Sequence, residues 1–293
     1  MLDKMLQVGW SSPGRTYLWG DGIISTWGPY RSVTWSPSTG AHAIYGDIHF
    51  RWVLVRRDSS LGFPISDEQD FSEGGRVSVF QRGAIYWWPD VGAIDLNDVV
   101  LHYTGLICFN ETDGEVSASD EPYSVIGIIS PNGTSNYGTQ IYENVDTGES
   151  VPDLVELYRG KPLGLTISVL VMEHDSGDPN KYRGIIKDAV DKGFDKVKTA
   201  LPLIPAVGPI LAVVGPPILD LIAPEITEFI NTVLGTGDDK IGETTIYLSP
   251  KQMVVMAALT NNSSERGIGY KTTTPLLQGD GSMYKLYFGL VPG

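Results

Sequence analysis

Short runs of β-branched and aromatic residues, bounded by turns that contain Gly, Asn, Asp or Pro, make up most of the apolar pattern of this chain. Such runs predict β-strands. The clearest of them lie at 99–109, 123–129, 165–172, 244–248 and 284–288. Their number and spacing indicate a fold that is mainly β.

The apolar pattern changes to helical spacing between about residues 179 and 235. Asp178 can cap a helix that has Pro179 at its first position. Apolar residues then recur at helical spacing, and charged residues occupy the opposite face. These apolar positions are Tyr182, Ile185, Ile186, Ala189, Val190, Phe194 and Val197. A second apolar face begins at Ile218, so the segment predicts a helical hairpin inserted into the β fold.

The stretch 199–219 joins the two predicted helices and carries no charge. It is nominally long enough to cross a bilayer, which takes about 20 apolar residues, but its prolines argue against one continuous span. Two interpretations remain open: a hairpin packed on itself and on the β domain, or a hairpin that opens into membrane lipid. The candidate insertion residues are Leu203, Ile204, Val207, Ile210, Leu211 and Val214.

The seven tryptophans divide the chain, because all of them lie between Trp10 and Trp88. The composition changes after the polar joint at 95–98. The sequence therefore predicts two domains: a small β repeat module at 1–98 and an antiparallel β-sandwich at 99–293. The sandwich is expected to carry the α-hairpin as an insertion at about 179–235.

Charge and cysteine content exclude several classes of protein. The formal net charge is −14, and an acidic surface repels phosphate backbones, so no nucleic-acid partner is expected. The single cysteine, Cys108, cannot form a disulfide within the chain.

No basic start followed by an apolar stretch precedes Trp10, so no secretory signal is visible. The oligomeric state stays open.

A repeat is visible in the first domain. Residues 33–41 align with residues 85–93 in the pattern apolar, x, Trp, x, Pro, x, x, Gly, Ala. The offset of about 50 residues falls in the range of small structural repeats. Each copy predicts a strand that ends in a turn containing Pro and Gly.

The segment between and around these copies resembles a known family. It contains Leu-Gly-Phe-Pro at 61–64, Ser-Asp-Glu at 66–68, Gly-Gly-Arg at 74–76 and a Phe-Gln-x-Gly-Ala-Ile-Tyr-Trp run at 80–87. These motifs, in this order over roughly 30–95, resemble the LGFP repeat family. The resemblance implies a module that attaches bacterial surface and secreted proteins to envelope polysaccharide.

The aromatic residues of this module have two interpretations. Each ring could fill the core of a small β module, or some rings could lie on the surface and stack on sugars, where one side is apolar and the other wet. Seven tryptophans exceed what about 100 residues usually bury, so at least two are expected to be exposed. The candidate glycan-binding residues are Trp35, Trp87, Trp88, Tyr86 and Arg76.

Acidic residues gather at strand ends in the second domain. Calcium prefers six to eight oxygen ligands collected from flexible loops, so these clusters suggest a calcium site. Ser-Asp-Glu-Pro-Tyr at 119–123, Glu-x-Asp at 173–175 and Asp-Lys-Ile-Gly at 239–242 resemble the calcium-dependent lipid-binding sandwich of protein kinase C and synaptotagmin. The resemblance implies calcium as cofactor, with ligands Asp113, Asp120, Glu173, Asp175 and Asp239.

No motif of a catalytic site was found, because G-x-S-x-G, H-E-x-x-H and a phosphate-binding Gly-Lys-Ser/Thr loop are all missing from the sequence. The sequence therefore favours a non-enzymatic, extracellular or envelope-associated protein that binds cell-wall or surface polysaccharide and calcium. The alternative is a membrane-active toxin that uses the apolar hairpin. A hydrolase with an unrecognised pair of carboxylates is the third hypothesis.

Overall fold

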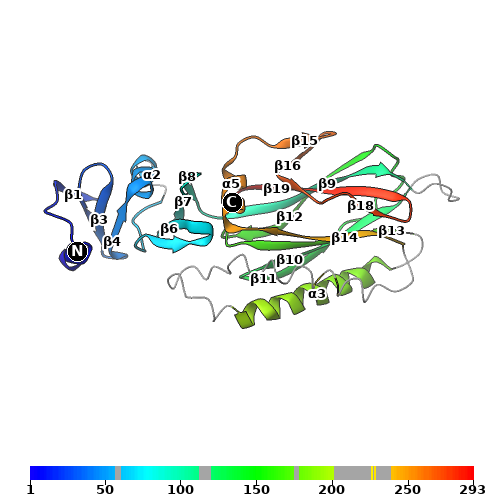
Figure 1. The fold of residues 1–293 in the computed structure, drawn as a ribbon, viewed down its shortest axis with the longest axis horizontal. Coiled ribbons are helices and arrows are strands. Elements are labelled where there is room, and N and C mark those ends of the chain that lie inside the picture. The colour runs from blue at the N-terminus through cyan, green and yellow to red at the C-terminus, as the bar shows by residue number, and fades with distance from the viewer. Residues whose placement is uncertain (57–60, 112–119, 175–177, 201–225, 227, 229–238) are drawn as a thin grey trace. The chain divides into compact units, whose positions relative to one another are not determined.

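The chain folds into two compact units, Met1–Asp98 and the region from Val99 onward (Figure 1). Each unit has its own hydrophobic core. The computed structural model describes residues 1–56, 61–111, 120–174, 178–200, 226, 228 and 239–293. In the part of the chain that the structure describes, strands account for about 52% and helices for about 21%, which confirms a mainly β fold with a helical insertion.

The first unit contains two four-stranded antiparallel sheets, and in each the strands pair in chain order. A short helix, α1 (Leu2–Val8), precedes the first sheet, and α2 (Gly46–Arg56) follows its last strand. The first sheet comprises β1 (Arg15–Trp19), β2 (Gly22–Thr26), β3 (Arg31–Ser36) and β4 (Gly40–Tyr45). The second comprises β5 (Gln69–Phe71), β6 (Gly75–Phe80), β7 (Gly83–Trp88) and β8 (Gly92–Leu96), with a 3-10 turn at Ser72–Gly74.

The sequence repeat corresponds to a structural repeat. In the first sheet Trp35 pairs with Ala41, and in the second Trp87 pairs with Ala93 at the same place in the β7–β8 hairpin. The turn glycines Gly40 and Gly92 adopt φ of 80° and 85°, a left-handed conformation that glycine accepts without strain. The shared Trp-x-Pro-x-x-Gly-Ala pattern therefore encodes the same hairpin twice.

The core of the first unit lies where α2 joins the two sheets. Trp52 on α2 is fully buried, and its ring lies 6.0 Å from that of Trp19 in the first sheet and 6.2 Å from that of Phe80 in the second. Its indole N–H donates to the Gly62 carbonyl at 2.9 Å. Phe63 is buried in the same cluster, so the Leu-Gly-Phe-Pro motif ties the second sheet to this helix.

The second unit contains two antiparallel sheets that form the layers of a β-sandwich (Figure 1). One sheet has the order β11-β10-β13-β14, and the other has the order β12-β9-β19-β17, with β18 also paired to β19. Their strands are β9 (Val99–Asn110), β10 (Pro122–Ser130), β11 (Gly133–Gly138), β12 (Ser150–Gly160), β13 (Leu165–Glu173), β14 (Asp239–Leu248), β17 (Thr272–Thr273), β18 (Leu277–Gly279) and β19 (Ser282–Pro292). A capped helix, α5 (Pro250–Ala258), and the small hairpin β15 (Ser263–Glu265) and β16 (Ile268–Tyr270) complete the unit.

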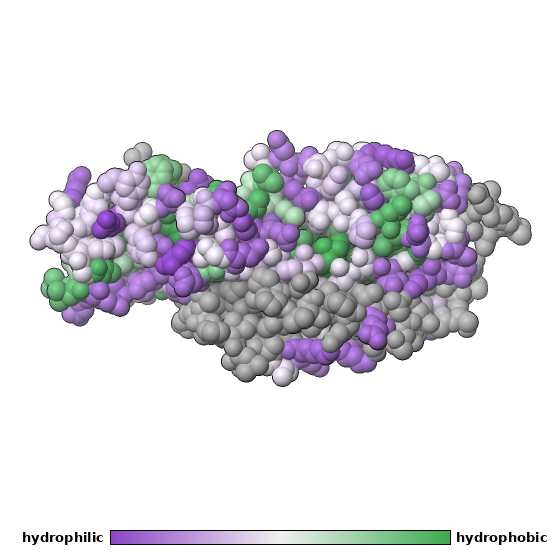
Figure 2. All heavy atoms as spheres, viewed as in Figure 1, coloured by the Kyte–Doolittle hydropathy of each residue, from purple (hydrophilic) through white to green (hydrophobic). Residues whose placement is uncertain are grey.

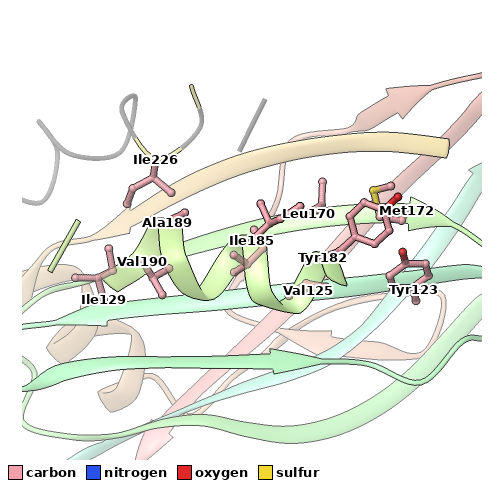
Figure 3. Packing of buried hydrophobic residues seen from close by; sticks show 11 residues of the cluster. Tyr123, Val125, Ile129, Leu170, Met172, Tyr182, Ile185, Ala189, Val190 and Ile226 are labelled. Atoms are coloured by element: carbon pink, nitrogen blue, oxygen red, sulfur yellow. The ribbon is translucent and has the colours of Figure 1, made fainter. Parts of the chain in front are cut away.

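The helix α3 (Pro179–Ala200) covers the outer face of the first of these sheets (Figure 3). Tyr182, Ile186 and Val190 pack against β10 and β13, so these two strands are buried on both faces. A side chain at Gly127 of β10 would clash with Ile186 and Val190, which explains the glycine in an otherwise apolar strand. The outward face of α3 is hydrophilic, as Figure 2 shows at the lower edge of the molecule.

The helical insertion predicted from the sequence is thus present in its first arm. The second predicted arm lies mostly outside the described residues, where only Ile226 and Glu228 are placed. Ile226 is buried in the same cluster as α3.

Candidate functional site

A pocket of about 420 Å³ opens on the first unit, where the end of the first sheet meets the second sheet. Its volume falls in the range of small-molecule sites. From here on, the first copy means the sheet β1–β4 with α2, and the second copy means residues 61–96 with the sheet β5–β8. The first copy contributes the junction of β4 and α2 to the pocket. The second copy contributes the chain before β5, the start of β6 and one residue of β7. The lining residues are Tyr45, Gly46, Asp47, Ile48, Glu68, Arg76 and Trp87.

Trp87 reaches the pocket because of strand alternation on β7. Tyr86 and Trp88 point to the face of the sheet that is fully buried, and each has no exposed surface. Trp87 points to the opposite face and is half-buried. Its indole N–H donates to Asp47 Oδ2 at 2.9 Å, so the first turn of α2 fixes the orientation of the ring.

Arg76 is held by three acceptors from three different segments. Its guanidinium donates through Nε to Glu68 at 2.8 Å, through Nη1 to Asp70 at 2.6 Å and through Nη2 to the Tyr45 hydroxyl at 3.1 Å. Burial opposes the charged form, but Tyr45, Glu68 and Asp70 together raise the pKa of Arg76. Arg76 is therefore a fixed cation that links the two copies.

Glu68 is the most enclosed charged group of the pocket, with a side chain that is 8% exposed. Its Oε1 accepts from Arg76, whereas its Oε2 is buried and has no hydrogen-bond partner within the described part of the chain. Burial raises the pKa of Glu68, and the Arg76 charge partly offsets that effect. A buried carboxylate oxygen without a donor is costly.

Aromatic rings continue from the pocket along the first sheet. Tyr45 is 38% exposed, and its ring lies 6.3 Å from that of Trp10 in an edge-to-face arrangement. Trp10 in turn lies 5.2 Å from Trp27, and the Arg31 guanidinium lies 5.8 Å from the Trp10 ring centroid. The pocket is thus extended on one side by a half-buried aromatic surface.

The structure places the predicted glycan-binding residues in three environments. Trp87 and Arg76 line the pocket. Tyr86 and Trp88 are fully buried core residues, so the prediction that their rings stack on a sugar was wrong. They are buried because neighbouring residues of a strand face opposite sides of the sheet, and only Trp87 faces the pocket. Trp35 is half-buried on β3 and does not line the pocket.

Two pocket residues, Tyr45 and Asp47, were missed by sequence reasoning. Tyr45-Gly46-Asp47 directly follows the repeat motif of the first copy, at the point where β4 ends and α2 begins. That transition from strand to helix was the available signal. It indicates a turn, but it does not indicate which surface the turn faces.

Of the five predicted calcium ligands, the structure describes Asp120, Glu173 and Asp239. Glu173 and Asp239 are directly opposite each other in the β13–β14 ladder. Asp113 and Asp175 lie outside the described residues. Across the part of the chain that the structure describes, no three His, Cys, Asp or Glu side chains are grouped as metal ligands would be.

Asp120, one of the predicted calcium ligands, also has a structural role in the β-sandwich. It is 3% exposed and accepts hydrogen bonds from the Ser282 hydroxyl at 2.5 Å and the Tyr284 hydroxyl at 2.9 Å. Burial, together with Cys108 and Asp120, raises the pKa of Tyr284, so this hydroxyl stays a donor. Asp120 therefore cross-links the start of β10 to β19.

The candidate membrane-insertion residues, from Leu203 to Val214, all lie outside the described residues. Within the described residues, no helix is both long and apolar enough to span a bilayer.

A comparison with known families identifies an LGFP repeat in the second copy. The family model of the LGFP repeat matches residues 61–101, which include the Leu-Gly-Phe-Pro motif, the second sheet and the start of β9. A search of curated proteins found no match. LGFP repeats occur in proteins associated with the cell envelope, and residues 61–101 of this chain match that repeat.

Proposed function

We propose that this protein binds a glycan of the cell envelope or cell surface through the pocket between the two copies. The observation that carries the proposal is the pocket itself, which has an indole wall and several polar groups and takes Glu68, Arg76 and Trp87 from the matched LGFP repeat. Sugars present an apolar face and a rim of hydroxyls, so such a combination suits them.

The geometry supports two kinds of contact. Trp87 offers part of its ring as a flat apolar surface, held in place by its hydrogen bond to Asp47. The carboxylates of Asp47 and Glu68 are hydrogen-bond acceptors for sugar hydroxyls beside that ring. Because these groups are held by internal hydrogen bonds, little conformational entropy is lost when a ligand binds.

The direct test is a glycan array probed with the wild-type protein, Trp87→Ala and Trp35→Ala. Trp35 is the matched control, since it occupies the equivalent hairpin position in the first copy but does not line the pocket. Trp87→Ala should weaken binding at least about tenfold, a change of about 1.4 kcal/mol. Trp35→Ala should retain it. Equal binding by a folded Trp87→Ala protein contradicts the proposal.

We propose separately that the second unit binds calcium, and the cross-strand pairing of Glu173 with Asp239 supports this proposal. It predicts that calcium raises the melting temperature and that a chelator lowers it. Linkage gives a stabilisation of about 2.7 kcal/mol at a hundredfold excess over the dissociation constant. An identical melting curve with calcium and with chelator removes this assignment.

A further inference from the structure

The pocket carries more negative than positive charge. Its lining residues include two carboxylates, Asp47 and Glu68, and one cation, Arg76. A third carboxylate, Asp70, is ion-paired with Arg76 at 2.6 Å and is itself 89% exposed. The single cation is therefore opposed by three acidic groups within one small surface.

The Arg76 guanidinium is poorly placed to bind an anion. Arginine commonly holds carboxylates and phosphates through paired N–H groups. Here Nε, Nη1 and Nη2 each already donate, to Glu68, Asp70 and Tyr45. These bonds take three of its five N–H groups, and an acidic ligand would also be repelled by the carboxylates beside it.

Glu68 favours a ligand that brings a hydrogen-bond donor. It lines the pocket as a carboxylate, so it can accept a hydrogen bond from a hydroxyl or an ammonium of the ligand. An acidic group beside it adds a second like charge in a partly desolvated place.

We infer that the pocket is selective for non-acidic sugars, neutral hexoses and amino sugars, and rejects uronate, sulfate and phosphate groups. This inference rests on the proposed glycan-binding function and adds the chemical class of the ligand. The same Arg76 that the sequence suggested as a ligand contact acts instead as a positioning residue for Glu68 and Tyr45.

The test uses two matched sets of probes whose backbones are identical and whose charges differ. One set comprises tetramers of glucosamine with a free amine, an N-acetyl group or an N-succinyl group. The other comprises dextran and its diethylaminoethyl and carboxymethyl derivatives. Binding of the full chain is measured by calorimetry alongside the array, which itself contains neutral, amino and acidic glycans.

The expected result is that every glycan bound in a Trp87-dependent manner is neutral or basic, and that the acidic derivative binds about tenfold more weakly than its neutral counterpart. Added salt should reduce this difference, because it screens the repulsion. Asp47→Asn and Glu68→Gln should each reduce the discrimination against the acidic derivative, whereas Asp21→Asn, an exposed carboxylate outside the pocket lining, should leave it unchanged.

The outcomes separate the two proposals. Trp87-dependent binding of an acidic glycan as tight as that of neutral ones overturns the charge selectivity and leaves glycan binding intact. Trp87-independent binding, or no binding to any probe or array glycan, overturns the proposed function and this inference with it.

Discussion

The two sheets of the first unit share a backbone and differ in surface chemistry. Both are four-stranded antiparallel meanders, and the equivalent residues Trp35 and Trp87 have the same cross-strand partner type. In the second sheet Arg76 is the residue opposite Trp87, whereas in the first sheet Ile23 is opposite Trp35. The repeat thus preserves the hairpin while the polar groups beside the tryptophan change.

This difference shows where such a repeat acquires a site. The pocket is formed by β4 and α2 of the first copy together with Glu68, Arg76 and Trp87 of the second. Neither sheet holds all of these groups, so the contact between copies creates the site. The predictions that follow concern substitutions that weaken the packing between the two copies or measure single interactions between them.

The largest effect is expected from Trp52→Ala. Trp52 is fully buried, contacts both sheets and donates a hydrogen bond to Gly62, so its loss leaves a cavity and an unpaired carbonyl. Truncation of a buried Trp to Ala costs about 3–5 kcal/mol. Denaturation followed by tryptophan fluorescence measures it. The control is Leu54→Ala on the same helix, where the side chain is 48% exposed, and a similar loss in both variants contradicts the central role of Trp52.

The next comparison uses one glycine from each copy, Gly22 on β2 and Gly75 on β6. An added Cβ at Gly22 would clash with the Trp35 carbonyl oxygen and the Phe63 ring, and one at Gly75 would clash with the Trp88 ring. Alanine at either site should destabilise by about 1–3 kcal/mol. Gly22→Ala should cost more, because a strand carbonyl cannot move without loss of ladder hydrogen bonds.

Gly14→Ala is the control for this pair, since its Cβ would make only an ordinary contact at 3.7 Å with the Thr26 carbonyl. Urea denaturation of the three variants gives the ranking. If Gly75→Ala is the most destabilising, the backbone contact at Gly22 is not the tighter constraint.

The strands that sequence reasoning located are those with strong apolar runs. The predicted strands 123–129 and 165–172 correspond to β10 (Pro122–Ser130) and β13 (Leu165–Glu173), which are buried on both faces. The strand β12 (Ser150–Gly160) was not predicted. It lies at a sheet edge, its burial alternates, and two bulges interrupt its register, so no continuous apolar run marks it.

The helix α2 was missed for a different reason. Residues 46–56 are rich in Ile, Phe, Trp and Val, which favour strands, and the helix forms because both sheets surround Trp52. Tertiary packing overrides such weak local preference. The site was recovered only in part for the same reason: Trp87 and Arg76 lie in the repeat motif, but Tyr45 and Asp47 reach them only through the packing of α2.

Acid should weaken the junction between the copies through Asp67. Its carboxylate accepts from Lys4 at 2.6 Å and from the Ala43 N–H at 2.9 Å, and His42 lies 3.5 Å away. Burial raises its pKa, but the hydrogen bonds from His42, Lys4 and Ala43 outweigh that effect and hold it well below the usual 3.8. The stability it contributes is therefore present above about pH 4 and is lost as the pH falls below that value.

Asp67→Asn should accordingly destabilise the first unit by about 1 kcal/mol near neutral pH and by less in acid. Its neighbour Glu68 acts in the opposite direction, because a raised pKa favours the folded state as the pH falls. Urea denaturation from about pH 7 to about pH 3 measures the difference between variant and wild type. If the difference in unfolding free energy stays constant over this pH range, protonation of Asp67 is not coupled to folding.

The smallest effect is expected at the ion pair between Arg51 of α2 and Asp95 of β8, which also joins the copies. Its side chains are 42% and 26% exposed, and the N–O distance is 2.5 Å. A pair at this exposure contributes under about 1 kcal/mol and is screened by salt. A double-mutant cycle with Arg51→Gln and Asp95→Asn isolates the coupling. Since Trp52 one residue along the same helix is expected to contribute several times more, a coupling as large as the Trp52→Ala effect would mean that charge, and not the buried indole, joins the two copies.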